Sequence, residues 1–99
     1  MLEKLDALEA RFKDIEEEMN RPDVMQDMKR YIKLSKDYKD LQPVVAAHKE
    51  YRNLLSNIAS AKDVLNTEKD EEFREMAKDE LNAYLRQKDE IEEKIRILL

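Results

Sequence analysis

The chain has 99 residues, of which 43% are charged and 41% hydrophobic, with no cysteine, one histidine and a formal net charge of −5. Without cysteine there are no disulfides or thiolate metal sites, and a single histidine excludes a metal site built on two histidines. Glycine is absent too, although it supplies the positive-φ corners of hairpins, phosphate-binding loops and strained catalytic turns. The composition therefore predicts a helical interaction module without a cofactor, and not an enzyme.

Apolar residues in the first twenty positions recur at spacings of three and four, which places them on one face of a helix. They are Leu2, Leu5, Leu8, Phe12, Ile15 and Met19. A first helix is predicted over residues 2–19. It ends near Asn20-Arg21-Pro22-Asp23 because asparagine suits a helix terminus, and proline fits only the first turn of a new helix. A tight reversal there makes the first two helices antiparallel neighbours.

A second and longer apolar stripe crosses Pro43 without losing phase. Its members are Val24, Met28, Tyr31, Leu34, Tyr38, Leu41, Val45, His48, Tyr51, Leu55, Ile58, Ala61 and Leu65. The stripe predicts one long helix over about residues 23–65, bent or briefly interrupted at Pro43, because an internal proline removes one backbone hydrogen bond at a cost of about 3 kcal/mol. Two helices meeting at Gln42-Pro43 are the alternative. His48 lies in the stripe, where a partly buried structural histidine is expected.

The third predicted helix covers residues 70–98. Thr67 or Asp70 can cap its start, and acidic residues in its first turn complement the helix dipole. Its seam follows a heptad in which Lys88 is the single polar intrusion. The seam consists of Phe73, Ala77, Leu81, Tyr84, Lys88, Ile91, Ile95 and Leu98. The chain then ends in an apolar run without a cap, which suggests an N-terminal fragment of a longer protein.

These elements predict an all-α fold, an antiparallel three-helix bundle with coiled-coil character that forms a single helical domain over residues 1–99. No apolar run approaches the roughly 20 residues of a membrane-spanning helix. The amino terminus is charged and amphipathic and lacks the apolar core of a signal peptide. A cytoplasmic location is therefore expected.

Basic residues gather in the middle of an otherwise acidic chain. Residues 21–40 carry six basic and four acidic groups, whereas residues 1–20 carry three and seven and residues 61–80 carry four and eight. The candidate partner-binding residues are Lys29, Arg30, Lys33, Lys36 and Lys39. Two interpretations stay open: ordinary surface charge paired with Asp37, Asp40 or the first helix, and contact with a phosphate backbone or an acidic protein.

Several blocks of the chain, two of them placed independently of the heptad (Pro22-Asp23 and Leu41-Gln42-Pro43-Val44-Val45), resemble the amino-terminal domain of bacterial class I peptide chain release factors. The type resembled is release factor one, which reads UAA and UAG. The resemblance covers essentially the whole chain. It rests on the opening residues 1–12, on Pro22-Asp23-Val24, on residues 34–45, which include Leu41-Gln42-Pro43-Val44-Val45, on Tyr51-Arg52 with Leu54-Leu55, and on residues 77–81.

The resemblance implies a domain of a translation termination factor whose whole form recognises a stop codon and triggers hydrolysis of peptidyl-tRNA. The family's catalytic Gly-Gly-Gln loop is missing because the chain has no glycine, and neither Pro22 nor Pro43 begins the codon-reading Pro-x-Thr tripeptide. The implied role is accessory: contact with the ribosomal stalk base near protein L11 and cooperation with the class II GTPase release factor, without a small-molecule substrate, membrane or cofactor. The alternative is a free-standing coiled-coil adaptor that binds another protein or a second copy of itself.

Overall fold

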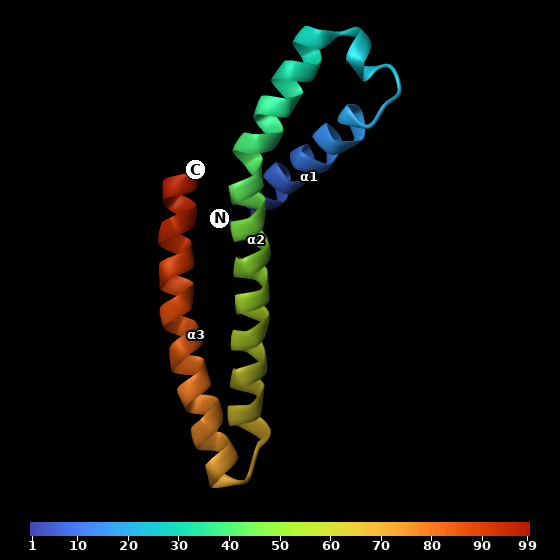
Figure 1. The fold of residues 1–99 in the computed structure, drawn as a ribbon. Helices are drawn as coiled ribbons and strands as arrows, with labels where there is room; N and C mark the ends of the chain where they lie inside the picture. Colours follow the sequence, from blue (N-terminus) through green and yellow to red (C-terminus); the bar gives the residue numbers. More distant parts are fainter. The chain divides into compact units, whose positions relative to one another are not determined.

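The computed structural model describes all 99 residues and contains helices only (Figure 1). In chain order the elements are α1 (Leu2–Met19), the short 3-10 helix η1 (Val24–Gln26), α2 (Met28–Thr67) and α3 (Glu71–Leu98). The predicted all-α class with three main helices and a long middle helix is confirmed. No helix combines the length and the apolar character needed to cross a bilayer.

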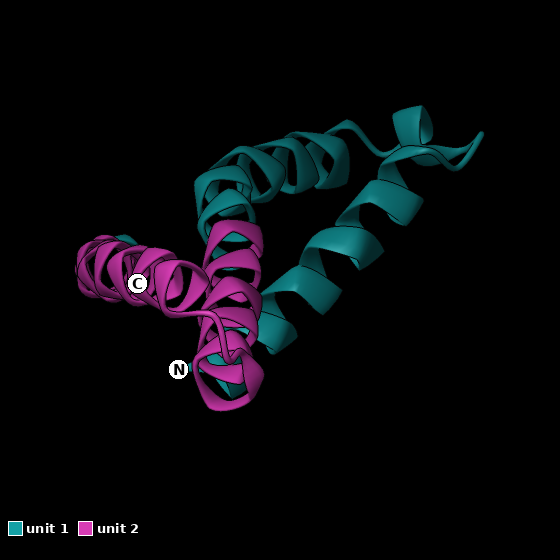
Figure 2. Ribbon diagram, turned by 90° about the horizontal axis from the view of Figure 1, so that it is seen from below, with its two compact units in different colours: residues 1–48, 98–99 teal, residues 49–97 magenta.

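The chain divides into two compact units, which Figure 2 colours separately. The first unit holds residues 1–48 with 98–99, and the second holds residues 49–97. Helix α2 contributes its first part to one unit and its second part to the other. That the 99 residues act as a single domain stays a prediction.

In the first unit, α1 and the first part of α2 are antiparallel, as their contacts show. Asp6 of α1 pairs with His48 of α2. Further along α1, the Phe12 ring stacks on Tyr38 with centroids 4.6 Å apart. At the end of α1, Glu18 pairs with Arg30 at 3.0 Å. Because the partner numbers fall along α2 as they rise along α1, the two helices run in opposite directions, as predicted.

The chain between these two helices differs from the predicted helix start at residue 23. Residues Val24–Gln26 form η1, and α2 begins only at Met28. The Asp27 carboxylate accepts a hydrogen bond from the backbone N–H of Arg30 at 3.2 Å, the geometry of a helix N-cap. Asp27 therefore sets the start of α2, and Pro22 lies in the turn before it.

Helix α2 is continuous through Pro43, so the alternative of two helices meeting at Gln42-Pro43 is wrong. Proline has no N–H, and the carbonyl of Lys39 therefore lacks its usual helical donor. Pro43 and Lys39 are both exposed, so water can hydrogen-bond to that carbonyl. Directly after the proline, Val44 and Val45 are buried, and this apolar burial offsets the missing hydrogen bond.

The second unit is an antiparallel helical pair with a heptad seam. Tyr51 of α2 donates to Glu92 of α3 at 3.4 Å, and near the other end Arg74 of α3 donates to the carbonyl of Leu65. The buried seam residues, spaced by three and four or multiples of a heptad, are Tyr51, Leu54, Ile58, Ala61, Ala77, Ile91 and Ile95. This spacing is typical of coiled-coil packing.

The turn between α2 and α3 satisfies its polar backbone through side chains. Asp70 accepts a hydrogen bond from the N–H of Glu72 at 2.9 Å, which makes Asp70 the N-cap of α3. Thr67 belongs to the last turn of α2, where its hydroxyl donates to the carbonyl of Asp63 at 2.9 Å. Of the two predicted caps, Asp70 is the one used.

Lys88, the polar intrusion in the predicted seam, is explained by its partners. Its ammonium pairs with Glu92 at 3.4 Å, and Glu92 also accepts the hydrogen bond from the buried Tyr51 hydroxyl. Burial raises the pKa of Tyr51 above its ordinary value of 10.0, and the negative charge of Glu92 raises it further, while Lys88 acts in the opposite direction.

This raised pKa predicts a loss of stability in alkali. Below about pH 10 the Tyr51 phenol is protonated in both states. As the pH rises further, the unfolded chain ionises first, so the stabilisation is lost on the way to the folded-state pKa. Denaturant unfolding between about pH 9 and pH 11 should therefore show a steeper decline for the original chain than for Tyr51→Phe. Parallel declines would contradict this prediction.

Candidate partner-binding surface

The predicted basic residues all lie on the first part of α2, within the first compact unit, and all are exposed. We call Lys29, Lys33, Lys36 and Lys39 the lysine face. At 100° per residue, the first three fall within an arc of about 60°, and Lys39 lies about 60° further round. The helix therefore presents a basic stripe to solvent.

Ion pairing separates Arg30 from the lysine face. Arg30 pairs with Glu18 of α1, so the interpretation as ordinary paired surface charge applies to this residue. None of the four lysines forms an ion pair. Asp37, which the sequence offered as their partner, is instead 3.9 Å from Arg11. The lysine face thus carries uncompensated positive charge that is open to a partner.

A hydrophobic residue lies among these lysines. The Ile32 side chain is 63% exposed, and its position on the helix falls between those of Lys36 and Lys39. These three residues, with Tyr31, Ser35 and Asp40, line a shallow hollow of about 350 Å³. A single exposed apolar side chain is ordinary on a protein surface, so the charge of the lysines is the main feature of this region. Ile32 could add a small apolar contact to a partner bound there.

Sequence reasoning missed Ile32 and misplaced Met28. Ile32 was left out because it falls outside the apolar stripe of α2, and that off-stripe position between lysines is the signal that could have found it. Met28 was predicted to belong to the stripe, but it is exposed. It is the first residue of α2, so it extends past the packed part of the helix.

His48 is a structural residue in the first unit. The side chain is 1% exposed, and its two ring nitrogens face carboxylates of α1: Nδ1 lies 2.5 Å from Glu9 and Nε2 lies 3.2 Å from Asp6. The ring therefore joins α2 to α1 and is more deeply buried than the sequence predicted.

Comparison with known proteins now identifies the family, because residues 8–99 match the model of the PCRF domain. The chain belongs to the PCRF domain family. The whole chain is 48% identical to peptide chain release factor 1 of Cytophaga hutchinsonii, and 46% identical to that of Bacteroides fragilis. It is 42% identical to peptide chain release factor 1 of Clostridioides difficile. The predicted resemblance to release factors is confirmed.

The PCRF domain is only a part of these relatives. The chain spans 28% of the Cytophaga protein and 27% of the Bacteroides protein. No solved structure matches the chain. The family assignment therefore rests on sequence similarity.

The PCRF domain shows no cluster of three or more histidine or carboxylate side chains arranged to hold a metal ion. Around His48, the two carboxylates lie on different ring nitrogens, so the three groups do not converge on one point. The chemistry that the described surface supports is recognition through charge, with the lysine face as the candidate contact.

Proposed function

We propose that this PCRF domain is the accessory amino-terminal domain of a translation termination factor. The complete factor would recognise the UAA and UAG stop codons and promote hydrolysis of peptidyl-tRNA. The observation that carries the proposal is the match to the PCRF domain over residues 8–99, together with identities of up to 48% to peptide chain release factor 1 over the whole chain. The proposal places the factor in the cytoplasm, where bacterial ribosomes work.

The domain's part in this function is positional. It would contact the ribosomal stalk base near protein L11 and take part in the cooperation with the class II GTPase release factor. Binding energy gathered there would help to orient the codon-reading and catalytic parts of the factor, which is a proximity effect. The chain itself contains no glycine, so a Gly-Gly-Gln loop would have to lie in another part of the factor, and this domain would perform no chemistry.

The lysine face is the surface proposed for the ribosome contact. Ribosomal RNA offers phosphate groups, and unpaired lysines on a helix surface bind phosphates through charge in a salt-dependent manner. Helix α2 holds the four ammonium groups along one side, while Arg30 is engaged by Glu18. The exposed Ile32 adds an apolar contact beside them.

Reversing two charges on the lysine face is expected to weaken ribosome binding. In the full-length factor, Lys33→Glu with Lys36→Glu should lower affinity for ribosomes stalled at a stop codon by about tenfold at low salt, because two attractions become repulsions of about 0.2–1 kcal/mol each. The salt dependence of binding should become shallower. Filter binding or fluorescence anisotropy over a salt series measures both quantities.

A matched control is available on the same helix. Lys49 and Lys62 are exposed residues of α2 outside the lysine face, so Lys49→Glu with Lys62→Glu makes the same change in net charge. This variant should bind nearly as well as the original factor. If both double variants lose the same affinity, the loss is caused by the change in net charge and not by the position of the lysines. If the lysine-face variant keeps its affinity at low salt, the proposed contact is refuted.

The coding region beyond the Leu99 codon tests the larger proposal. A continuation that encodes Gly-Gly-Gln and Pro-x-Thr is expected for a stop-codon-reading factor. A stop codon directly after Leu99 would favour the coiled-coil adaptor. Sedimentation of the 99-residue chain would then show whether it forms a stable dimer at low micromolar concentration.

A further inference from the structure

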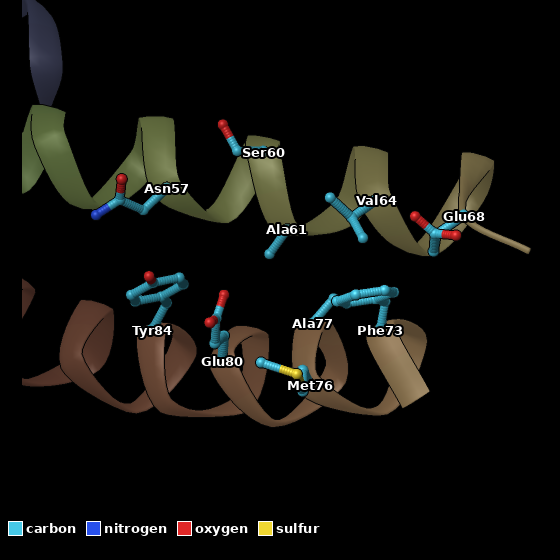
Figure 3. A pocket seen from close by; sticks show the side chains of 10 residues that line it. All are labelled: Asn57, Ser60, Ala61, Val64, Glu68, Phe73, Met76, Ala77, Glu80 and Tyr84. Carbon is cyan, nitrogen blue, oxygen red and sulfur yellow. The ribbon is translucent and has the colours of Figure 1, made fainter. Parts of the chain in front are cut away.

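The second compact unit carries a groove of about 400 Å³ along one side of the contact between α2 and α3 (Figure 3). Its floor is apolar, with the buried Ala61 and Ala77 on the two helices. Its full lining consists of Asn57, Ser60, Ala61, Val64, Glu68, Phe73, Met76, Ala77, Glu80 and Tyr84. The lysine face lies on other residues, so the proposed function makes no use of this groove.

Large apolar side chains of the groove remain accessible to solvent. Phe73 is 56% exposed and Met76 is 57% exposed, and Val64 across from them on α2 is also exposed. Figure 3 shows the Phe73 ring extending from α3 toward Val64. The heptad pattern placed Phe73 in the seam between the helices, where a buried side chain is expected. This expectation is wrong, because Phe73 is exposed. Clustered accessible aromatic and methionine side chains are typical of surfaces that receive a partner helix.

The charges around the groove are acidic. Glu68 of the turn and Glu80 of α3 line it, whereas no lysine or arginine does. Residues 61–80 carry eight acidic and four basic groups. The groove therefore offers an apolar floor beside negative charge, a combination that favours an apolar stripe flanked by lysine or arginine.

The length of the groove suits a short helix. Its lining on α2 runs from Asn57 to Val64, which is about 10 Å at 1.5 Å per residue, and Glu68 extends it into the turn. Side chains at i, i+4 and i+7 of a bound helix span about 10 Å. Three successive anchors of an amphipathic helix therefore fit along the floor.

A second copy of the chain is a poorer occupant. A symmetric dimer through this groove would bring the same acidic residues of both copies together. Like charges facing each other oppose association, and the chain already has a net charge of −5. A basic partner avoids this repulsion.

We propose that the groove between α2 and α3 binds a basic amphipathic helix of a partner protein, with Phe73 and Met76 as its apolar anchors and Glu68 and Glu80 as its charge partners. The inference does not depend on the proposed function, because it rests on the groove alone. It gives the domain a protein-binding surface separate from the lysine face.

The test uses the 99-residue chain and a designed peptide of about 14 residues made of leucine, alanine and lysine, with leucines at i, i+4 and i+7 and lysines on both flanks. A twin peptide carries glutamate at every lysine position. Methyl NMR follows Ala61, Val64 and Met76 during titration. The basic peptide should shift these signals, and the acidic twin should bind at least tenfold more weakly.

Substitutions at the two proposed anchors test whether they contribute to the affinity for the basic peptide. Phe73→Lys and Met76→Lys should each weaken the basic peptide at least tenfold, and because both side chains are exposed, the helical circular dichroism should be unchanged. Leu85→Lys is the matched control, since Leu85 is an exposed apolar residue of α3 outside the groove. It should leave affinity unchanged.

Four results would overturn the proposal. The first is equal binding of the two peptides, the second is the absence of shifts at the groove methyl groups, and the third is equal loss of affinity in the Leu85 control. Self-association of the chain that Phe73→Lys abolishes would also overturn it and would assign the groove to a second copy. None of these measurements contains a ribosome, so they can fail while the release-factor proposal stands.

Discussion

Replacing Ile95 with alanine is expected to lower the free energy of unfolding by about 2–5 kcal/mol. Ile95 is 1% exposed on α3, so the substitution removes buried methyl and methylene groups and leaves a cavity that the two helices of the second unit close only in part. Domains of this size are stable by about 5–15 kcal/mol, so the loss is a large share of the total. Urea unfolding followed by helical circular dichroism measures it.

Ile97 supplies a control of the same residue type on the same helix. It is 77% exposed, so Ile97→Ala should change the free energy of unfolding by no more than about 0.5 kcal/mol. The two substitutions delete the same atoms and differ only in burial. Similar losses at both positions would show that the burial of Ile95 does not set the size of the effect, since alanine has the higher helix propensity and propensity alone would give no loss.

The contrast between Ile95 and Phe73 shows how much of the fold the sequence predicts. Both occupy the same heptad seam, yet Ile95 is buried and Phe73 is exposed. Phe73 lies in the first turn of α3. The heptad pattern predicts which side of a helix faces its neighbour. How deeply each side chain is buried depends on which side chains of the neighbouring helix lie opposite it. The heptad pattern therefore predicted the positions of the helices better than the burial of individual side chains.

Partnerships between distant residues were the least predictable feature. Lys88 and Glu92 are four residues apart, a spacing at which an ion pair is expected on a helix, but nothing in the sequence indicated that Glu92 would also accept a hydrogen bond from Tyr51. The exposure of the lysine face could be predicted because those residues lie off the apolar stripe. Their lack of ion pairs could not, since it depends on Arg11 and Arg30 occupying the nearby carboxylates of Asp37 and Glu18.

Replacing His48 with alanine is expected to lower the free energy of unfolding by about 2–4 kcal/mol. The change removes a fully buried ring and takes away the ring nitrogens that lie beside the carboxylates of Asp6 and Glu9. The Asp6 carboxylate is half exposed and can be solvated by water, whereas Glu9 is less exposed. Most of the polar part of the loss should therefore come from Glu9. His48→Leu, which fills the space without donors, separates this polar part from the cavity.

Double-mutant cycles test that division between the two carboxylates. His48→Leu is combined with Glu9→Gln in one cycle and with Asp6→Asn in the other, and each free energy of unfolding is measured in urea. The coupling energy should be larger with Glu9, because its side chain is less exposed than that of Asp6 and water therefore screens the interaction less. Contacting residues typically couple by about 0.5–3 kcal/mol. Coupling near zero in both cycles would mean that His48 stabilises the first unit by its volume alone.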